Sequence, residues 1–245
     1  MIKLFRRIRK SLIEENNMGK YFKYAIGEIL LVVIGILIAL QINNWNEARK
    51  TRNSEVSYLH SIKNDLQNDN STIDFIIDDT SKRISNYESF IEQLKEFDTI
   101  SDSRPLYSLT TSNYGFIDLK LQDHTIETLK NSGNIDIISL NSMRELIQVY
   151  YDTAEIISIH QDLMNTYMVD NKLVGFFNYL ACDKGIENNT IVPFDENAQQ
   201  NLPEAYAYIS EWIGWLVDYR TLLRNLSRKN NDLVISIEEN YPSNN

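Results

Sequence analysis

A hydrophobic run from Tyr24 to Ile42 constrains this chain more than any other feature of its sequence. Its 19 residues include twelve Ile, Leu and Val and one charged residue, Glu28. This is about the length that crosses the hydrocarbon core of a bilayer, and the apolar side chains outweigh the cost of one carboxyl near the start of the run. No small-x-small cleavage pattern follows the run, which disfavours a cleaved signal peptide. We therefore predict a single transmembrane helix over residues 24–42.

Positive charge is concentrated on the N-terminal side of this run. Residues 1–23 hold seven Lys and Arg, whereas three follow shortly after the run. By the positive-inside rule, residues 1–23 are a basic cytoplasmic leader and residues 43–245 are a periplasmic domain, anchored in the inner membrane. The leader has apolar residues at helical spacing, so it is either an interfacial helix or a solvated tail. Three aromatic residues are expected to anchor the span at its two interfaces: Tyr21, Tyr24 and Trp45.

Small and polar residues within the run indicate a contact with a second membrane helix. Gly27, Gly35 and Ala39 fall on one helix face, and the spacing from Gly35 to Ala39 lets another helix approach closely. Glu28 is the sharper signal, because a carboxyl inside a bilayer usually faces protein, water or a cation. The alternative is that Glu28 extends to the headgroups, where basic residues just before the run are candidate partners. We predict these four residues as the membrane-helix contact.

The rest of the chain is acidic and has the apolar spacing of helices. From Asn53 onward, 14 Lys and Arg face 30 Asp and Glu, a balance that repels phosphate backbones and argues against a nucleic-acid partner. Apolar residues recur every three or four positions in three long segments, which predicts helices. The first segment comprises Leu59, Ile62, Leu66, Ile73, Ile76, Ile84, Tyr87, Ile91, Leu94 and Phe97. The second comprises Leu146, Tyr150, Ile157, His160, Met164, Tyr167, Val174 and Phe177. The third comprises Ile209, Trp212, Leu216, Tyr219, Leu223, Leu226, Leu233 and Ile237.

Terminal signals place the ends of the second and third helices. A capping box at Ser142-x-x-Glu145 opens the second helix, and Gly185 closes it. The stretch from Asn201 to Glu204 starts the third helix, which ends before Pro242. The connection between the two helices is long and polar, which is typical of a loop.

Residues 99–141, between the first and second helices, are expected to form short helices. One of these runs from an N-cap at Asp123 to Asn131, with Gly133 as its stop. Three amphipathic helices of similar length need one another to bury their apolar stripes. The predicted fold is therefore all-α: a transmembrane helix followed by an extracytoplasmic antiparallel bundle of three long helices, capped by the short helices.

Two blocks of the sequence resemble a known family. The first is KYAIGEILLVVIGILIALQINNWNEARK, from Lys23 to Lys50, and the second is ETLKNSGNIDIISLNSMRELIQVYY, from Glu127 to Tyr151. They are similar to the opening and to the central pattern of a family of uncharacterised single-pass membrane proteins found mainly in Bacteroidota. The resemblance implies a location in the cell envelope. It implies no activity and no catalytic residues, because the family is one of unknown function.

Motifs of catalysis and cofactor binding are absent from the sequence. It has no G-x-S-x-G, P-loop, G-x-G-x-x-G or H-E-x-x-H pattern, so we expect no enzyme, no cofactor and no metal centre. His160 is expected to be a hydrogen-bonded structural residue rather than a ligand. Asp78 with Asp79, and Asp152 with Glu155, are expected on solvated helix faces, with a weak divalent-cation site as the alternative.

Two further sets of residues allow a structural and a functional interpretation. Aromatic residues gather near the start of the third helix: Tyr206, Tyr208, Trp212, Trp215 and Tyr219. Core packing is favoured for them over an aromatic cage around a ligand. Asp98-Thr99-Ile100 and Asp152-Thr153-Ala154 resemble the O-glycosylation signal of periplasmic proteins in the phylum named above, and the first, at a predicted turn, is the better candidate.

These features lead to one functional hypothesis and one alternative. We expect a membrane-anchored envelope protein whose body is a non-enzymatic interaction or scaffold module. Its expected partners are the lipid bilayer, other membrane or envelope proteins, and a second copy of the chain in a homo-oligomer. The alternative is a helical bundle that senses a ligand and signals through a partner membrane protein, because long paired helices beside a membrane span resemble the input domains of chemoreceptors.

Overall fold

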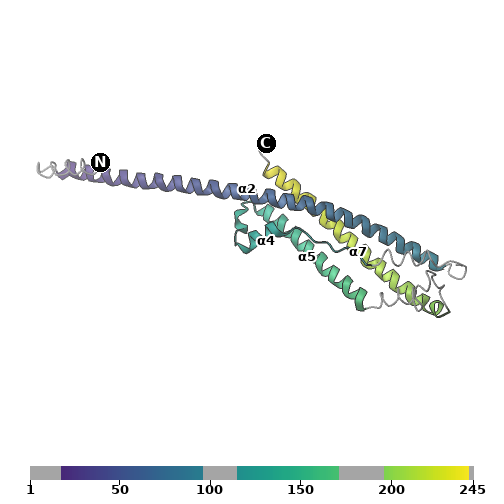
Figure 1. The fold of residues 1–245 in the computed structure, drawn as a ribbon. Coiled ribbons are helices and arrows are strands. Elements are labelled where there is room, and N and C mark those ends of the chain that lie inside the picture. The colour runs from purple at the N-terminus through teal and green to yellow at the C-terminus, as the bar shows by residue number, and fades with distance from the viewer. Residues whose placement is uncertain (1–17, 96–114, 171–195, 243–245) are drawn as a thin grey trace, which may run out of the picture. The chain divides into compact units, whose positions relative to one another are not determined.

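The computed structural model describes residues 18–95, 115–170 and 196–242. These residues are almost all helical, and none of them lies in a β-strand. The elements shown in Figure 1 are α2 (Met18–Lys95), α4 (His124–Asn131), the 3-10 helix η2 (Ile135–Ile137), α5 (Asn141–Asp170) and α7 (Glu196–Asn240). The predicted all-α class is confirmed.

The chain divides into two compact units, Met1–Val56 and Ser57–Asn245, here named the N-terminal unit and the body. Helix α2 contains residues of both units. It is continuous because no glycine or proline follows Gly35 before the end of the helix. The predicted division into a leader over 1–23, a span over 24–42 and a domain over 43–245 stays a prediction.

In the N-terminal unit, the apolar run lies on α2 with its side chains exposed. The Ile, Leu and Val side chains from Ile26 to Ile42 have exposed fractions of 44–65%. Among the described helices, α2 is the one with the length and composition to cross a membrane. The prediction of a long apolar N-terminal helix is confirmed, whereas its inner-membrane location and its orientation stay predictions.

In the body, side chains from α2, α5 and α7 form one apolar core. All eight predicted positions of the third helical segment are 0% exposed on α7. From the other two predicted stripes, the following are at most 7% exposed: Leu59, Ile62, Leu66, Ile73, Ile76, Ile84, Tyr87, Tyr150, Ile157, Met164 and Tyr167. Ile91, Leu146 and His160 are half-buried. The side chains of Leu94, Phe97, Val174 and Phe177 lie outside the described residues. The helical period therefore predicted most of the core.

Contacts between α2 and α7 show that the two helices run in opposite directions. The Lys63 ammonium donates to the Glu238 carboxylate at 2.9 Å. Further along α2, the Ser81 hydroxyl accepts from Arg220 at 3.4 Å. Residue numbers thus rise on α2 while they fall on α7.

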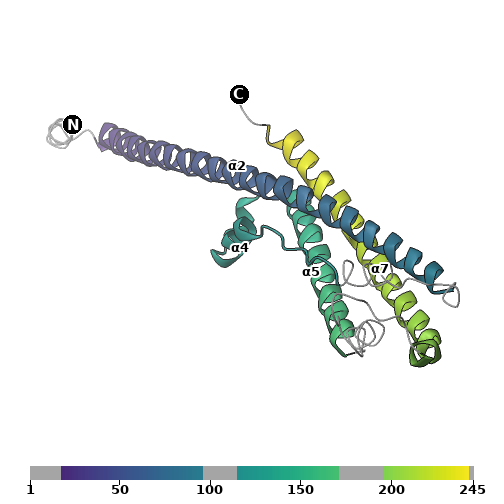
Figure 2. The ribbon, with the colours of Figure 1, turned by 45° about the vertical axis from the view of Figure 1, so that its right-hand side comes forward.

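Helix α5 is also antiparallel to α7. Asn230 donates to the Tyr150 hydroxyl at 3.4 Å, and the Tyr167 hydroxyl donates to Glu211 at 2.9 Å. Within the body, α2 and α5 consequently run in the same direction, as Figures 1 and 2 show. The predicted antiparallel bundle of three long helices is therefore not confirmed: α7 is antiparallel to both neighbours, but α2 and α5 are parallel. Consecutive helices do not alternate here, because Gly115–Asp123, between α2 and α5 in the sequence, returns along the body.

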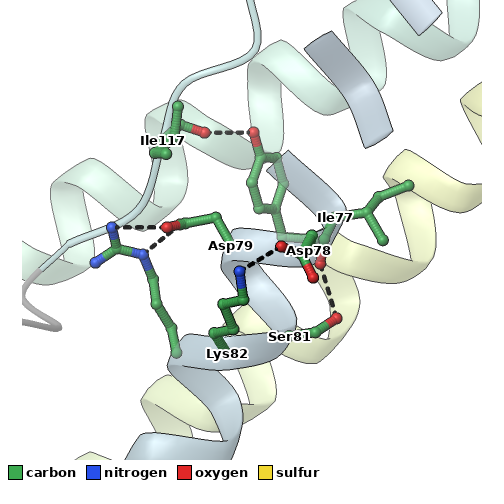
Figure 3. A network of polar contacts seen from close by, with 8 residues as sticks. Ile77, Asp78, Asp79, Ser81, Lys82 and Ile117 are labelled. Carbon is green, nitrogen blue, oxygen red and sulfur yellow. Dashed lines mark hydrogen bonds and ion pairs between the residues drawn. The ribbon is translucent and has the colours of Figure 1, made fainter. Parts of the chain in front are cut away.

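The segment from Gly115 to Asp123 makes the final part of this return. Ile117 accepts a hydrogen bond at its carbonyl from the Tyr219 hydroxyl at 2.8 Å, as the upper dashed line in Figure 3 shows. Further along the segment, the Gln122 N–H donates to the Asp69 carboxylate at 2.8 Å. Tyr219 is next to Arg220, which contacts Ser81 on α2. The segment therefore passes from near Ser81 to Asp69, against the direction of α2.

The predicted short helix is confirmed as α4, which follows Asp123 and ends at Asn131. Gly133 has a φ of 68°, a conformation that glycine adopts without strain. The N–H of Asn134 donates to the carbonyl of Leu129 at 3.0 Å, and that of Gly133 to the second-to-last residue of α4. This is a Schellman motif, so the predicted glycine stop is correct. The Asp123 side chain makes no capping hydrogen bond, so its predicted N-cap contact is not formed.

Two predicted helix starts are wrong. Helix α5 begins at Asn141, so Ser142 lies inside the first turn and not at the N-cap. The Arg144 guanidinium donates to the Asn141 side chain and to the Ile138 carbonyl just before the helix. Helix α7 begins at Glu196 and contains Pro203 in its interior. A proline removes a single N–H and disturbs only the preceding turn, so it does not have to mark a helix start.

Candidate functional site

The predicted membrane-contact residues lie on α2, and no other part of the described chain packs against the two glycines among them. Gly27 and Gly35 have no neighbouring atom within 4 Å of the point where a Cβ would stand. Ala39 is exposed, and Glu28 is half-buried. Seven residues make almost two helical turns, so Glu28 and Gly35 project from nearly the same side of α2. The four residues thus share a face of small side chains and one carboxyl, and their role in a helix contact stays a prediction.

The predicted interfacial anchors lie near the two ends of the apolar run. Tyr24 is 55% exposed and Trp45 is 64% exposed. The Arg49 guanidinium lies 5.5 Å from the centre of the Trp45 ring, a cation–π distance that places positive charge next to this aromatic residue. Tyr21 lies on α2, but its side chain is outside the described residues. Exposed aromatic residues with a polar or charged neighbour suit the headgroup region of a bilayer.

A buried polar cluster joins the three long helices of the body; we name it the Asp69 network. The Tyr150 hydroxyl donates to Asp69 at 3.1 Å, and the Gln122 N–H donates to the same carboxylate at 2.8 Å. Asn230 donates to the Leu66 carbonyl at 2.9 Å and to the Tyr150 hydroxyl at 3.4 Å. Asp69 is 2% exposed, and Tyr150 and Asn230 are 0% exposed. The sequence analysis did not identify this network.

Burial raises the pKa values of the titratable side chains in and beside the Asp69 network. Burial raises the pKa of Asp69 above its ordinary value, although the hydrogen bonds from Gln122 and Tyr150 lower it in part. Burial, together with the nearby Asp69 charge, also raises the pKa of Tyr150 and of its neighbour Tyr151 far above the ordinary tyrosine value. Tyr150 is therefore a neutral donor to Asp69. The Tyr151 hydroxyl, in contrast, is buried without a hydrogen-bond partner.

The carboxylates in and beside the Asp69 network join helices through hydrogen bonds. Among the described residues, no group of three His, Cys, Asp or Glu has the geometry of a metal site. Asp65 accepts a hydrogen bond from Thr125 at 2.5 Å, which ties α4 to α2 beside the Asp69 network. The network and this bond fix the register of α2, α5 and α7, and the position of α4.

Of the five aromatic residues at the start of the third predicted helix, Trp212 and Tyr219 are buried in the core and the other three are half-buried. The rings of Tyr167 and Trp212 are stacked, with centroids 6.2 Å apart and planes at 8°. Phe116 packs edge-on against Tyr219 at 5.4 Å. Trp212 and Tyr219 are 0% exposed, and Tyr206 is half-buried. This arrangement fits the core-packing interpretation, because the aromatic rings pack against one another.

His160 occupies the structural role that the sequence indicates. Its Nε2 lies 3.3 Å from the carbonyl oxygen of Trp215, and its ring centroid lies 5.1 Å from that of the Trp215 side chain. The imidazole is half-buried. A histidine bound to a backbone carbonyl and packed against an indole ring connects α5 to α7.

The two adjacent carboxylates Asp78 and Asp79 are paired with cations on their own helix. Asp78 lies 2.5 Å from the Lys82 ammonium, and Asp79 lies 2.5 Å from the Arg83 guanidinium (Figure 3). Both pairs join residues four positions apart, one turn along α2. Asp78 and Lys82 are exposed, as the sequence predicts, whereas Asp79 and Arg83 are half-buried. Each carboxylate has a positive partner.

The fold makes the second candidate glycosylation triplet, Asp152-Thr153-Ala154, inaccessible. Thr153 is 6% exposed, and its hydroxyl donates to the Val149 carbonyl at 2.7 Å inside α5. Asp152 accepts from Gln148 at 2.5 Å on the same helix. A buried hydroxyl within a helix cannot reach a modifying enzyme. The first triplet, at residues 98–100, lies outside the described residues, as does the predicted helix stop at Gly185.

With one apolar helix able to cross a membrane and a helical body held by buried polar contacts, the described residues define a class of all-α proteins with a candidate membrane anchor. The sequence of residues 28–190 matches a protein family described as a family of unknown function (DUF6090). The chain belongs to this family. The match includes α4, α5 and most of α2, whereas α7 lies beyond it. No curated protein and no solved structure matches the chain.

Proposed function

We propose that this protein is a membrane-anchored, non-enzymatic interaction module. In this proposal residues 24–42 stay in the inner membrane, and the body is a periplasmic bundle in which α7 runs antiparallel to α2 and α5. The observation that carries the proposal is the apolar run on α2, whose side chains are exposed along the whole segment.

The energetics of the run favour the bilayer. Twelve Ile, Leu and Val residues contribute roughly −0.3 to −0.6 kcal/mol each on insertion, against about +3 kcal/mol for one carboxyl at the centre of a span. Glu28 lies near the start of the run, where the cost is smaller. Insertion is therefore favourable by roughly 1–4 kcal/mol even if Glu28 carried the full central cost. An exposed apolar surface of this extent in water would instead cause aggregation.

The composition of the span supports a contact with another membrane helix. Helices in lipid associate where small residues let backbones approach, and Gly27 and Gly35 offer such a face with nothing packed on it. Glu28 projects from nearly the same side as Gly35. A partner helix that donates a hydrogen bond to this carboxyl would lower the cost of holding it in the membrane.

Crosslinking in native membranes tests the membrane contact. We expect Glu28→Gln and Gly35→Leu each to reduce the crosslinked complexes of the full chain several-fold, because one removes the charge and the other fills the open face. Val33→Leu adds bulk on the opposite side of the helix and should leave the complexes unchanged. If all three variants retain the complexes, the membrane contact must lie elsewhere.

Ligand sensing remains the alternative hypothesis. Thermal-shift screening of the full chain discriminates between the two functions. A saturable ligand raises the melting temperature in proportion to RT ln(1 + [L]/Kd), whereas an interaction module shows no such response to small molecules.

A further inference from the structure

Helix α5 has a second apolar face that the body does not bury. Val149, Ile156, Ile159 and Leu163 are 42%, 53%, 54% and 50% exposed. They are spaced at seven, three and four positions, so they line one side of the helix. The residues that α5 buries in the core, among them Tyr150, project from a different side. We name the four exposed residues the α5 stripe.

The charges around the α5 stripe have one sign. Glu145 and Asp152 lie in line with the stripe, and Glu155 and Asp162 border it on the solvent side; all four are exposed. Arg144 is the one basic residue of α5, and it binds Asn141 and a carbonyl just before the helix. The stripe is therefore apolar and negatively charged, with no Lys or Arg of its own helix free to neutralise it.

We propose that the α5 stripe is a docking surface for an amphipathic helix of another protein, one that carries Lys and Arg beside its apolar residues. From Val149 to Leu163 the stripe covers 15 residues, and the 14 steps between them make roughly 21 Å along the axis at 1.5 Å per residue. Apolar anchors at this spacing are how a groove or face recognises a helix of similar length. The inference deepens the proposed interaction function, on which it rests, by naming a surface of the body and the chemistry of its partner.

A second copy of the chain fits this surface poorly. Pairing two stripes would bring together eight carboxylates with no compensating cation from α5, and like charges across an interface cost several kcal/mol. Four half-exposed aliphatic side chains also supply only part of the roughly 800 Å² per partner that a standard interface buries. A basic helix avoids the repulsion, because its cations meet the carboxylates while its apolar residues cover the stripe.

Peptide binding to the full chain in zwitterionic lipid nanodiscs tests the chemistry. The probe is a synthetic helix of about 20 residues with Leu at positions three and four apart and Lys beside them, and its match has Glu in place of Lys. Fluorescence anisotropy should show about tenfold tighter binding of the Lys peptide, and added salt should weaken it. Empty nanodiscs give the baseline. Equal affinities for the two peptides would overturn the proposal.

Variants locate the binding on the stripe. The triple change Ile156→Ser, Ile159→Ser and Leu163→Ser should weaken binding of the Lys peptide at least tenfold. Ile235→Ser replaces an isoleucine that is 52% exposed on α7 and should have no effect. Asp152→Asn with Glu155→Gln keeps the apolar residues and should remove the preference for Lys over Glu, which tests the proposal even if the triple variant unfolds. The proposal would be overturned if the triple variant still bound the Lys peptide as tightly as the wild type and the double variant still preferred the Lys peptide to the Glu peptide.

A photocrosslinking residue at position 159 of the full chain tests the partner in native membranes, with position 235 as control. A crosslink to a basic amphipathic helix of another protein, absent from the control, supports the proposal. A crosslink to a second copy or to another part of the same chain overturns it, as does no crosslink at all. Loss of complexes in the Glu28 and Gly35 variants with no crosslink at position 159 would leave the proposed function standing and remove this inference alone.

Discussion

Replacing Tyr150 by Phe removes one hydroxyl from the Asp69 network and leaves the aromatic ring in place. The hydroxyl donates to the Asp69 carboxylate at 3.1 Å and accepts from Asn230 at 3.4 Å. A hydrogen bond to a charged group contributes about 1.5–3 kcal/mol, and the second, longer bond contributes less. We expect Tyr150→Phe to lower the free energy of unfolding by about 2 kcal/mol, or roughly 4–8 °C in melting temperature.

The loss should depend on pH. Because the Tyr150 hydrogen bond lowers the pKa of Asp69, its removal raises that pKa further above the ordinary value. The variant is therefore most destabilised where Asp69 is ionised, and less destabilised as the carboxyl gains a proton at lower pH. Urea unfolding of the full chain in nanodiscs, followed by far-UV circular dichroism at several pH values, measures both effects.

Tyr151→Phe is the matched control. Its hydroxyl is also buried on α5, but it has no hydrogen-bond partner, so its removal should be neutral or stabilising. Equal losses in Tyr150→Phe and Tyr151→Phe would show that the hydroxyl contacts are not what stabilises the body. A neutral Tyr150→Phe would refute the Asp69 network as a tie between helices.

Three further predictions use the same unfolding measurement. The folded-state pKa of Asp69 is raised, so Asp69 contributes stability below its ordinary pKa, and this stability is lost as pH rises through the raised value. Asp69→Asn lacks this pH dependence. Its free energy of unfolding should therefore increase relative to that of the wild type as pH rises. Leu226→Ala empties a site that is 0% exposed and should cost about 2–5 kcal/mol, whereas Ile235→Ala at an exposed site should cost under about 1 kcal/mol. Gly214→Ala adds a Cβ that meets nothing within 4 Å in helix α7 and should stabilise by about 0.4–1 kcal/mol, whereas Gly133→Ala at φ 68° should destabilise by about 1–2 kcal/mol. A destabilising Gly214→Ala with a neutral or stabilising Gly133→Ala, or equal costs for the two alanine changes, would contradict the packing described above.

The apolar core of the body followed from the sequence because its helices keep a regular period. Every predicted core position of the third helix, from Ile209 to Ile237, is fully buried on α7. The stop of α4 at Gly133 was also predictable, since a positive φ after a helix favours glycine over other residues. Both features depend on neighbours within a few positions in the chain.

The Asp69 network was missed because charged and amide residues were assigned to the surface. A signal was present in the spacing. Asp69 lies three positions after Leu66 and four before Ile73, and Asn230 lies four positions after Leu226 in the same way. A polar residue at a stripe position should therefore have been tested as a buried hydrogen-bonding group.

The direction of the helices could not be predicted from local patterns. Amphipathic stripes show that α2, α5 and α7 have faces to bury, but they do not distinguish a parallel from an antiparallel neighbour. The parallel arrangement of α2 and α5 depends on the return of the chain through Gly115 to Asp123. Contacts such as that of Ile117 with Tyr219 join residues far apart in sequence, and a single sequence gives no direct sign of them.

Extraction of the full chain from native membranes with alkaline carbonate tests membrane anchoring most directly, because a cleaved signal sequence has the same length and composition as a retained span. With a tag at the C-terminus, the account predicts a chain of 28.6 kDa plus the tag that stays in the membrane pellet. A shorter chain that begins after residue 42, or a full-length chain in the soluble fraction, would contradict it.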